Sequence, residues 1–282
     1  MHSQPNHTAK KKSNSSFYLK VFLIALAAVI LTFLFIYYGL GYQVLRVQSG
    51  NGEITFFGKV SKGQAVSGTL YYENNVKASL DAKKSALYYA NGDIYEGKIV
   101  NLMRHGDGKM SYTNSGDVYE GSFINDQISG KGKYTYSNGD VYVGQLVAGK
   151  REGVGKYTWA DGDVYEGSFS HNEKNGNGKY TWSNGSFYEG LYADDKKNDE
   201  NGYFEWENGD TYRGSFVNDV RDGYGTYTWY SIGDKYEGEF KNNKLDGLGT
   251  YTWKDGRAPY TGKFENGVIV VENTKTEQET AE

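Results

Sequence analysis

Acidic residues recur at fixed places in this sequence, and clustered carboxylates are the side chains that most often bind calcium or act as acid–base pairs. An aspartate follows Asn-Gly at Asp93, Asp140 and Asp210, and follows Asp-Gly at Asp163. Each lies directly after a turn signal and returns with it, so capping of the turn explains these residues. The Gly-Gly-x-Gly-x-Asp pattern of calcium-binding β-helices is absent. The spacing therefore predicts no metal site.

The other residues capable of catalysis are scattered. Of the four histidines, His2 and His7 lie in the N-terminal tail, and His105 and His171 lie in predicted hairpin loops. There is no cysteine, and no Ser/His/Asp spacing has supporting context. Gly-x-Gly recurs, but it lies between two predicted strands rather than before a helix, which does not favour phosphate binding. We therefore interpret the chain as a non-enzyme without a cofactor.

Aromatic side chains are the remaining candidates, because Tyr and Trp supply much of the energy of protein interfaces. A tryptophan recurs at one equivalent position in successive repeats, and another aromatic residue stands two places before it. The sequence leaves open whether these rings fill a core of their own or line an open groove. The candidate partner-binding aromatics are Tyr157, Trp159, Tyr180, Trp182, Phe204, Trp206, Tyr227, Trp229, Tyr251 and Trp253.

These rings belong to an internal repeat. A Tyr-x-Gly anchor returns every 23 or 24 residues, and a fixed period of this length indicates a repeat array. The anchors begin at Tyr95, Tyr119, Tyr142, Tyr165, Tyr188, Tyr212, Tyr236 and Tyr260.

Each repeat has the pattern of a β-hairpin. Around Tyr119, ring-bearing or glycine positions alternate with polar ones, which is the two-residue period of a strand. We expect a polar loop over 125–130, a second strand over 132–136, and a turn at Asn138-Gly139 that leads to the next repeat. The sequence thus predicts an all-β, elongated and twisted antiparallel meander of hairpins.

The pattern resembles the MORN (membrane occupation and recognition nexus) repeat. The resemblance rests on Tyr-Glu-Gly-x-Phe, then Gly-x-Gly-x-Tyr-x-Trp, then Asn/Asp-Gly-Asp, recurring in register over residues 90–267. Departures include Glu200, in place of the first Gly of Gly-x-Gly, and one-residue insertions at Ser115 and Ile232. The resemblance implies a protein-interaction or scaffold module rather than an enzyme.

A single segment has the properties of a transmembrane helix. Val21–Tyr38 is an uncharged apolar run that as a helix would extend about 27 Å, close to the hydrocarbon thickness of a bilayer. We favour a retained anchor over a cleaved signal peptide, because no Ala-x-Ala-like site follows. Lysines precede the run, so we expect a cytoplasmic N-terminus and repeats on the extracytoplasmic side of the cell membrane.

The expected organisation has five parts. Residues 1–20 form a basic cytoplasmic tail, 21–38 the transmembrane helix, 39–89 a juxtamembrane segment with degenerate repeats, 90–267 the repeat array, and 268–282 an acidic tail.

We infer a membrane-anchored interaction or scaffold module that presents an aromatic-lined sheet to a protein partner, and we expect no nucleic acid partner. Two alternatives stay open: binding of extracellular glycans or the cell wall, and binding of a lipid surface. Against lipid, the chain beyond the N-terminal lysines carries more acidic than basic residues. The sequence does not indicate an oligomeric state.

Overall fold

The computed structural model describes residues 15–50 and 52–271. They form one helix and 22 strands, and the chain divides between Ala90 and Asn91 into two compact units. The class is thus mainly β, as predicted, with an antiparallel meander in each unit, and the strand pairings join strands that are near neighbours in the sequence. Of the predicted acidic tail, residues 272–282 lie outside the described residues, as does most of the predicted basic tail.

The first unit begins with the apolar helix α1 (Ser15–Gly39), which starts earlier than the predicted run. Its side chains are apolar on all sides and are exposed, with Ile24 at 71% and Phe35 at 82% of full exposure. A helix that is hydrophobic all round is normally covered by protein or by lipid. α1 is long and apolar enough to cross a membrane, a property it shares with signal sequences.

Five strands follow in the first unit, and they form a meander of their own. In β2, Phe56 is fully buried, and its ring lies against Gly58 and against Gly68 of β3, which is the register partner of Gly58. Phe56-x-Gly58 therefore packs like a Tyr-x-Gly anchor without the hydroxyl. The strands are β1 (Tyr42–Ser49), β2 (Gly52–Ser61), β3 (Gln64–Tyr72), β4 (Lys77–Asp81) and β5 (Ala86–Tyr89).

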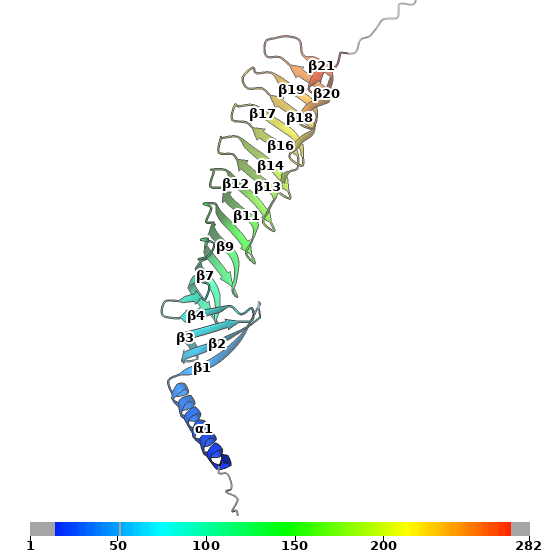
Figure 1. Ribbon diagram of the computed structural model, residues 1–282. Coiled ribbons are helices and arrows are strands. Elements are labelled where there is room, and N and C mark those ends of the chain that lie inside the picture. Colours follow the sequence, from blue (N-terminus) through cyan, green and yellow to red (C-terminus); the bar gives the residue numbers. More distant parts are fainter. Residues whose placement is uncertain (1–14, 51, 272–282) are drawn as a thin grey trace, which may run out of the picture. The chain divides into compact units, whose positions relative to one another are not determined.

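The second unit is the repeat array, and Figure 1 shows its strands succeeding one another in chain order. Each repeat contributes a hairpin. The strands are β6 (Ile94–Val100), β7 (Met103–Ser111), β8 (Val118–Ile124), β9 (Gln127–Thr135), β10 (Val141–Val147), β11 (Lys150–Thr158), β12 (Val164–Ser170), β13 (Glu173–Thr181), β14 (Phe187–Ala193), β15 (Lys196–Lys197), β16 (Asp199–Glu205), β17 (Thr211–Val217), β18 (Val220–Thr228), β19 (Lys235–Lys241), β20 (Lys244–Thr252), β21 (Tyr260–Glu265) and β22 (Val268–Ile269).

The turns differ from the sequence-based expectation. The loop expected over 125–130 is a two-residue turn, in which Asn125 and Asp126 both take positive φ (48° and 69°), and the second strand starts at Gln127. Asn and Asp tolerate this conformation, and a two-residue turn with two positive φ values suits the twist of paired strands. At Asn138-Gly139, where such a turn was expected, only Gly139 has a positive φ (98°), within a three-residue loop closed by Tyr136 N–H···O=C Asp140 (2.9 Å).

The glycines inside the strands make room for tyrosine rings. Tyr165 is fully buried, and its ring lies over Gly167 and over the register partner of that residue, Gly178 on β13. A Cβ on Gly167 would lie 2.5 Å from the Tyr165 hydroxyl and 2.5 Å from the Cα of Gly178. The Tyr165 hydroxyl donates a hydrogen bond to the carbonyl of Ser168 (2.9 Å). The bare backbone of two strands is thus the surface on which each anchor tyrosine packs.

A second ring joins each anchor to the next. Phe169 packs edge-on against Tyr165, with ring centroids 5.0 Å apart, and against Tyr142 of the preceding repeat at 5.4 Å. Tyr192 takes the same place one repeat later, 5.3 Å from both Tyr165 and Tyr188. We call this buried row of anchor rings and their edge-on neighbours the core column. It crosses the repeat boundaries from Tyr95 to Tyr260 except the one between Tyr119 and Tyr142, where the buried Leu146 takes the place of the bridging ring, so it supplies the nearest-neighbour coupling on which repeat proteins depend.

We expect Gly167→Ala to lower the free energy of unfolding by about 1–3 kcal/mol, because the added methyl group must displace the Tyr165 ring. Ser168→Ala is the matched control: Ser168 is next in the chain and lies on the opposite face, so its replacement should be close to neutral. Denaturant unfolding of the two variants measures the difference, and equal losses of stability would show that the faces are assigned wrongly.

Candidate partner-binding face

The pairing register places the aromatic residues of both strands on one face of the array. Tyr165 pairs with Tyr180 and Gly167 with Gly178, while Glu166 pairs with Lys179 on the other side. We call the side that carries the anchor tyrosines the front face and the side that carries Glu166 and Lys179 the back face. The front face holds the core column and, beside it, the aromatic residues proposed from the sequence.

The structure brings all ten proposed aromatics into a single file, which we call the aromatic ladder. From Tyr157 to Trp253, successive ring centroids are 4.4–5.3 Å apart, within a repeat and across each boundary. The ring planes are tilted by 34–52° to their neighbours. Tyr134 and Tyr136 extend the file by one repeat, with centroids 4.5 Å apart.

Most rings of the ladder are only partly buried. Tyr157 is buried, and the other nine rings are half-buried. The anchor tyrosines Tyr165, Tyr188 and Tyr212 are by contrast fully buried. Each ladder ring therefore packs against its neighbours and still presents part of its surface to the outside, which is the condition for a rigid aromatic contact surface.

Aspartates hold the ladder to the preceding repeat. The carboxylate of Asp140 accepts hydrogen bonds from the Tyr157 hydroxyl (2.7 Å) and from the backbone N–H of Ala160 (2.9 Å). Asp163 binds Tyr180 (2.5 Å) and the N–H of Ser183 (2.8 Å) in the same way. Turn capping is thus only part of the role of these residues, because each one joins its turn to the next hairpin. The same pair of bonds recurs at Asp117, Asp210 and Asp234.

One repeat departs from this scheme at both partners. Ser186 stands in place of the aspartate, and Phe204 stands in place of the tyrosine that would donate to it. The Ser186 hydroxyl still accepts the N–H of Glu207 (2.9 Å), so the bond to the next turn is kept. Phe204 has no hydroxyl to satisfy, and its ring stays in the file, 4.4 Å from Trp206. This repeat thus lacks both the tyrosine hydroxyl and the carboxylate that would accept from it, so no buried hydroxyl is left without an acceptor.

Hydrogen bonding sets the charge state of these aspartates. Burial alone would raise the pKa of Asp163, but the hydrogen bonds from Tyr180 and from the Ser183 N–H outweigh it, and the pKa lies below its ordinary value. The pKa of Asp140 is lowered by its bonds to Tyr157 and Ala160 in the same way, against the effect of burial. Both carboxylates are therefore ionised at neutral pH and bind their tyrosines through charge-assisted hydrogen bonds.

A row of cations that was not predicted from the sequence lies on the front face, between the core column and the ladder. Arg221 lies over four rings, with its guanidinium 5.3 Å from the centroid of Tyr227 and 5.4 Å from that of Trp206. Lys174 lies over three tyrosine rings at 5.1–5.8 Å. Alignment of the repeats would have revealed these residues, since each is the second residue of the strand that follows the two-residue turn. The full set is Arg104, Arg151, Lys174, Lys197 and Arg221.

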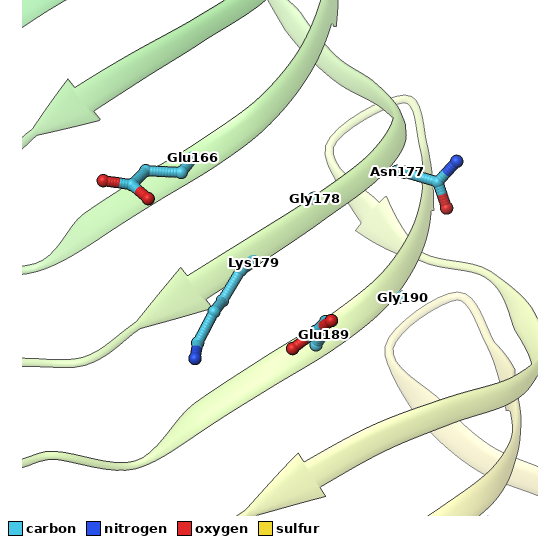
Figure 2. Close-up of a pocket in the computed structure, with 6 residues that line it drawn as sticks. All are labelled: Glu166, Asn177, Gly178, Lys179, Glu189 and Gly190. Atoms are coloured by element: carbon cyan, nitrogen blue, oxygen red, sulfur yellow. The ribbon is translucent and has the colours of Figure 1, made fainter.

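The back face carries charged residues together with exposed apolar side chains such as Val154 and Leu248, and shallow depressions mark it. One depression has a volume of about 440 Å³. Figure 2 shows three of its lining residues, Glu166, Lys179 and Glu189, side by side on three consecutive strands. Opposite charges alternate along this row, and Lys156 forms an ion pair with Glu166 (2.6 Å). Such exposed pairs contribute little stability. A second depression, of about 600 Å³, surrounds Glu200, where the second strand is broken between Lys197 and Asp199.

The side chains around His171 do not form a catalytic relay. Ser170 and Glu152 both approach His171, at 3.0 and 3.6 Å, but both contact the same ring nitrogen, Nδ1. A relay needs the nucleophile and the carboxylate on different nitrogens. In residues 15–50 and 52–271, no group of three His, Cys, Asp or Glu side chains is placed to hold a metal ion.

We expect Asp163→Ala to destabilise the array by about 1–3 kcal/mol at pH 7, because the Tyr180 hydroxyl and the Ser183 N–H both lose their acceptor. The pKa of Asp163 is lowered in the folded state, so its contribution is present above the ordinary Asp value of about 3.9 and is lost as the pH falls through the folded value. The stability difference from the unmodified chain should therefore shrink on acidification.

Asp161→Ala is the control for this prediction. Asp161 lies in the same turn, but it accepts only the backbone N–H of Asp163 (3.1 Å). Thermal melts of both variants between pH 7 and pH 3 provide the measurement. A loss in Asp161→Ala as large as in Asp163→Ala would contradict the inter-repeat role of Asp163.

Comparison with known proteins identifies the repeat. The family model described as MORN repeat matches residues 119–141, 142–164, 165–187, 212–231 and 236–256. The unmatched stretch between the third and fourth segments contains Glu200 and the broken second strand. Comparison of the sequence with curated proteins found no match.

Solved structures give only weak likenesses. The TCP domain of Drosophila melanogaster SAS-4 (dCPAP), in complex with a proline-rich motif of Ana2, is 14% identical, with 61% of this chain and 90% of that chain covered and a TM-score of 0.33. The TCP10 domain of Danio rerio CPAP, in complex with a STIL peptide, is 12% identical, with 79% and 100% covered and a TM-score of 0.38. At these scores, neither structure informs the fold or the function of this chain.

The five matched segments share the period, the anchor tyrosines, the paired glycines and the aspartate links described above. Five segments within residues 119–256 are thus MORN repeats.

Proposed function

We propose that this chain is a membrane-anchored interaction module whose MORN array presents the aromatic ladder to a protein partner. MORN repeats suggest a protein-interaction or scaffold role. The observation that carries the proposal is the half-exposed ladder itself. Its rings are fixed by neighbours on both sides and by the aspartate links, so a partner gains aromatic contacts without the cost of ordering flexible side chains.

The middle of the ladder is the best place for a partner. Trp182, Trp206 and Trp229 each have ring neighbours in two directions. Interface energy concentrates in Trp and Tyr side chains near the centre of a contact surface. A glycan could also stack on such rings, and a lipid surface is the third candidate; the acidic excess beyond the N-terminal lysines works against anionic lipid.

The proposed anchor is α1. It is apolar on all sides and unburied, and it satisfies the length of a membrane span. Lysines precede its apolar part and few basic residues follow it closely, so the positive-inside rule favours a cytoplasmic N-terminus with the array on the other side.

One labelling experiment tests both parts of the proposal, because the chain contains no cysteine. A single cysteine is introduced as Ser183→Cys, in the exposed turn beside Trp182, or as Asn177→Cys on the back face. Intact cells are treated with a membrane-impermeant maleimide that carries a photoactivatable benzophenone. We expect both variants to be labelled, and we expect Ser183→Cys alone to cross-link to a discrete protein on illumination.

Ser3→Cys is the topology control and should react only after permeabilisation. Labelling of Ser3→Cys but not of the array in intact cells would reverse the orientation, and a shortened product lacking residue 3 would replace the anchor with a cleaved signal. Cross-linking from Asn177→Cys and not from Ser183→Cys would move the partner to the back face. A cross-link from Ser183→Cys that glycosidase or lipase treatment removes would favour glycan or lipid.

A further inference from the structure

The cations of the front face form a row with a regular spacing. Arg151, Lys174, Lys197 and Arg221 occupy one equivalent position in four consecutive repeats, and Ile128 and Leu245 take that position in the flanking repeats. Each repeat adds two strands, so neighbouring cations are about 9.6 Å apart along the array. The row runs beside the aromatic ladder, across the strands.

Part of this positive charge is not neutralised within the described part of the chain: Asp195, whose carboxylate accepts the backbone N–H of Lys174 (2.8 Å), and Asp219 attract the Lys174 ammonium from beyond ion-pair distance, whereas the two arginines have no such carboxylate partner. Lys197 pairs with Asp219 (3.4 Å), but Arg151, Lys174 and Arg221 have no carboxylate within ion-pair distance there. The guanidinium of Arg221 donates instead to the neutral side-chain and backbone oxygens of Asn243, and that of Arg151 donates to the backbone oxygen of Asn172. The Nε of Arg151 is buried without a hydrogen-bond acceptor.

Lys174 shows the arrangement most clearly. Its ammonium group is half-buried over Tyr165, Tyr180 and Tyr192, and it donates no hydrogen bond to another described residue. Burial lowers its pKa. Ring faces attract a cation, but they do not satisfy an ammonium's hydrogen-bonding capacity. Asp195 and Asp219 supply negative charge at a distance, and a carboxylate approaching from outside would supply the missing hydrogen-bond acceptor.

The spacing distinguishes among the conformations of a bound chain. A polyproline II helix has three residues per turn and rises about 9.3 Å per turn, so every third side chain faces the same way. Over the three intervals between four cations, the length of this helix differs from the length of the row by only about 1 Å. In a β-strand, every third side chain alternates between faces. An α-helix rises about 10.5 Å in seven residues, and its mismatch reaches about 3 Å.

We propose that this row, together with the ladder, receives an acidic segment of a protein partner in the polyproline II conformation, with a carboxylate at every third position. The carboxylates bind Arg151, Lys174, Lys197 and Arg221, and the residues between them pack on the Tyr and Trp rings. Aromatic-lined surfaces are the usual receptors for this helix, because it is already ordered before it binds. The inference rests on the proposed function, since it names the chemistry of the partner.

Synthetic peptides test the proposal on the full chain in a non-ionic detergent. The probes are fluorescein-labelled (Glu-Pro-Pro)₅, its (Gln-Pro-Pro)₅ counterpart, and a peptide with the composition of the first in which the five glutamates are consecutive. We expect (Glu-Pro-Pro)₅ to bind at least about tenfold more tightly than either of the others, since charge-assisted hydrogen bonds are lost or misplaced in both. Its affinity should fall as the salt concentration rises.

The matched variants are Lys174→Gln and Lys179→Gln. Both remove one positive charge from β13, on the front and on the back face respectively, so the net charge of the chain is the same in the two. We expect Lys174→Gln to weaken binding of (Glu-Pro-Pro)₅ about fivefold to tenfold and Lys179→Gln to change it less than about twofold. Similar melting temperatures would exclude misfolding as the cause.

The outcomes separate the inference from the function on which it rests. If (Glu-Pro-Pro)₅ and (Gln-Pro-Pro)₅ bind equally well and Trp206→Ala abolishes both, the partner segment need not be acidic. The inference would then be overturned, and the proposal that the ladder binds a protein would stand. Binding of polygalacturonate that depends on Lys174, without binding of any peptide, would overturn both in favour of an acidic glycan. Failure of every probe would overturn the inference, and the cross-linking from Ser183→Cys would then decide the proposed function independently.

Discussion

The array depends on one contact, in which a tyrosine ring lies flat on two glycines that face each other across a strand pair. A single-layer sheet has no second layer to cover its side chains, so burial must be achieved within one face. At Tyr165 the ring covers the bare backbone of Gly167 and Gly178 and is fully buried. Phe169 then fills the space between this ring and Tyr142. The core column therefore joins this repeat to the one before it, and it explains why strands so rich in glycine, which is unfavourable there, are nevertheless stable.

Because the core column provides the fully buried side chains, the neighbouring ladder rings and cations can stay partly exposed. The ladder rings, represented by Trp206, are half-buried, and they stay ordered through their neighbours and through the aspartate links. The cations, represented by Lys174, cover the rings and keep their charge near the surface. One face of the sheet thus has a stabilising part and a part suited to recognition, while the back face alternates the charges of Glu166 and Lys179 and exposes apolar side chains such as Val154.

Much of the fold could be predicted from the sequence, because a regular repeat period shows which residues occupy equivalent positions. The return of the anchor after Tyr165 and Tyr188 predicted the hairpins, and the alternation of residues predicted the faces. Turn geometry could not be predicted in the same way, since Asn125-Asp126 contains no glycine and does not stand out as a tight turn. The link from Asp163 to Tyr180 joins residues in different hairpins, and a one-dimensional pattern does not show that their side chains meet. Lys174 was missed because a lysine near a turn has the same pattern as a solvated residue.

The most direct test of this account compares Tyr212→Ala with Trp206→Ala by denaturant unfolding. Tyr212 is fully buried in the core column, and Trp206 is a half-buried ring of the ladder on the same face. We expect Tyr212→Ala to cost about 3–5 kcal/mol, and Trp206→Ala to cost only about 1 kcal/mol through its lost ring contacts. If Trp206→Ala costs as much as Tyr212→Ala, the ladder is part of the core, and the division of the front face into a stabilising part and a binding part is wrong.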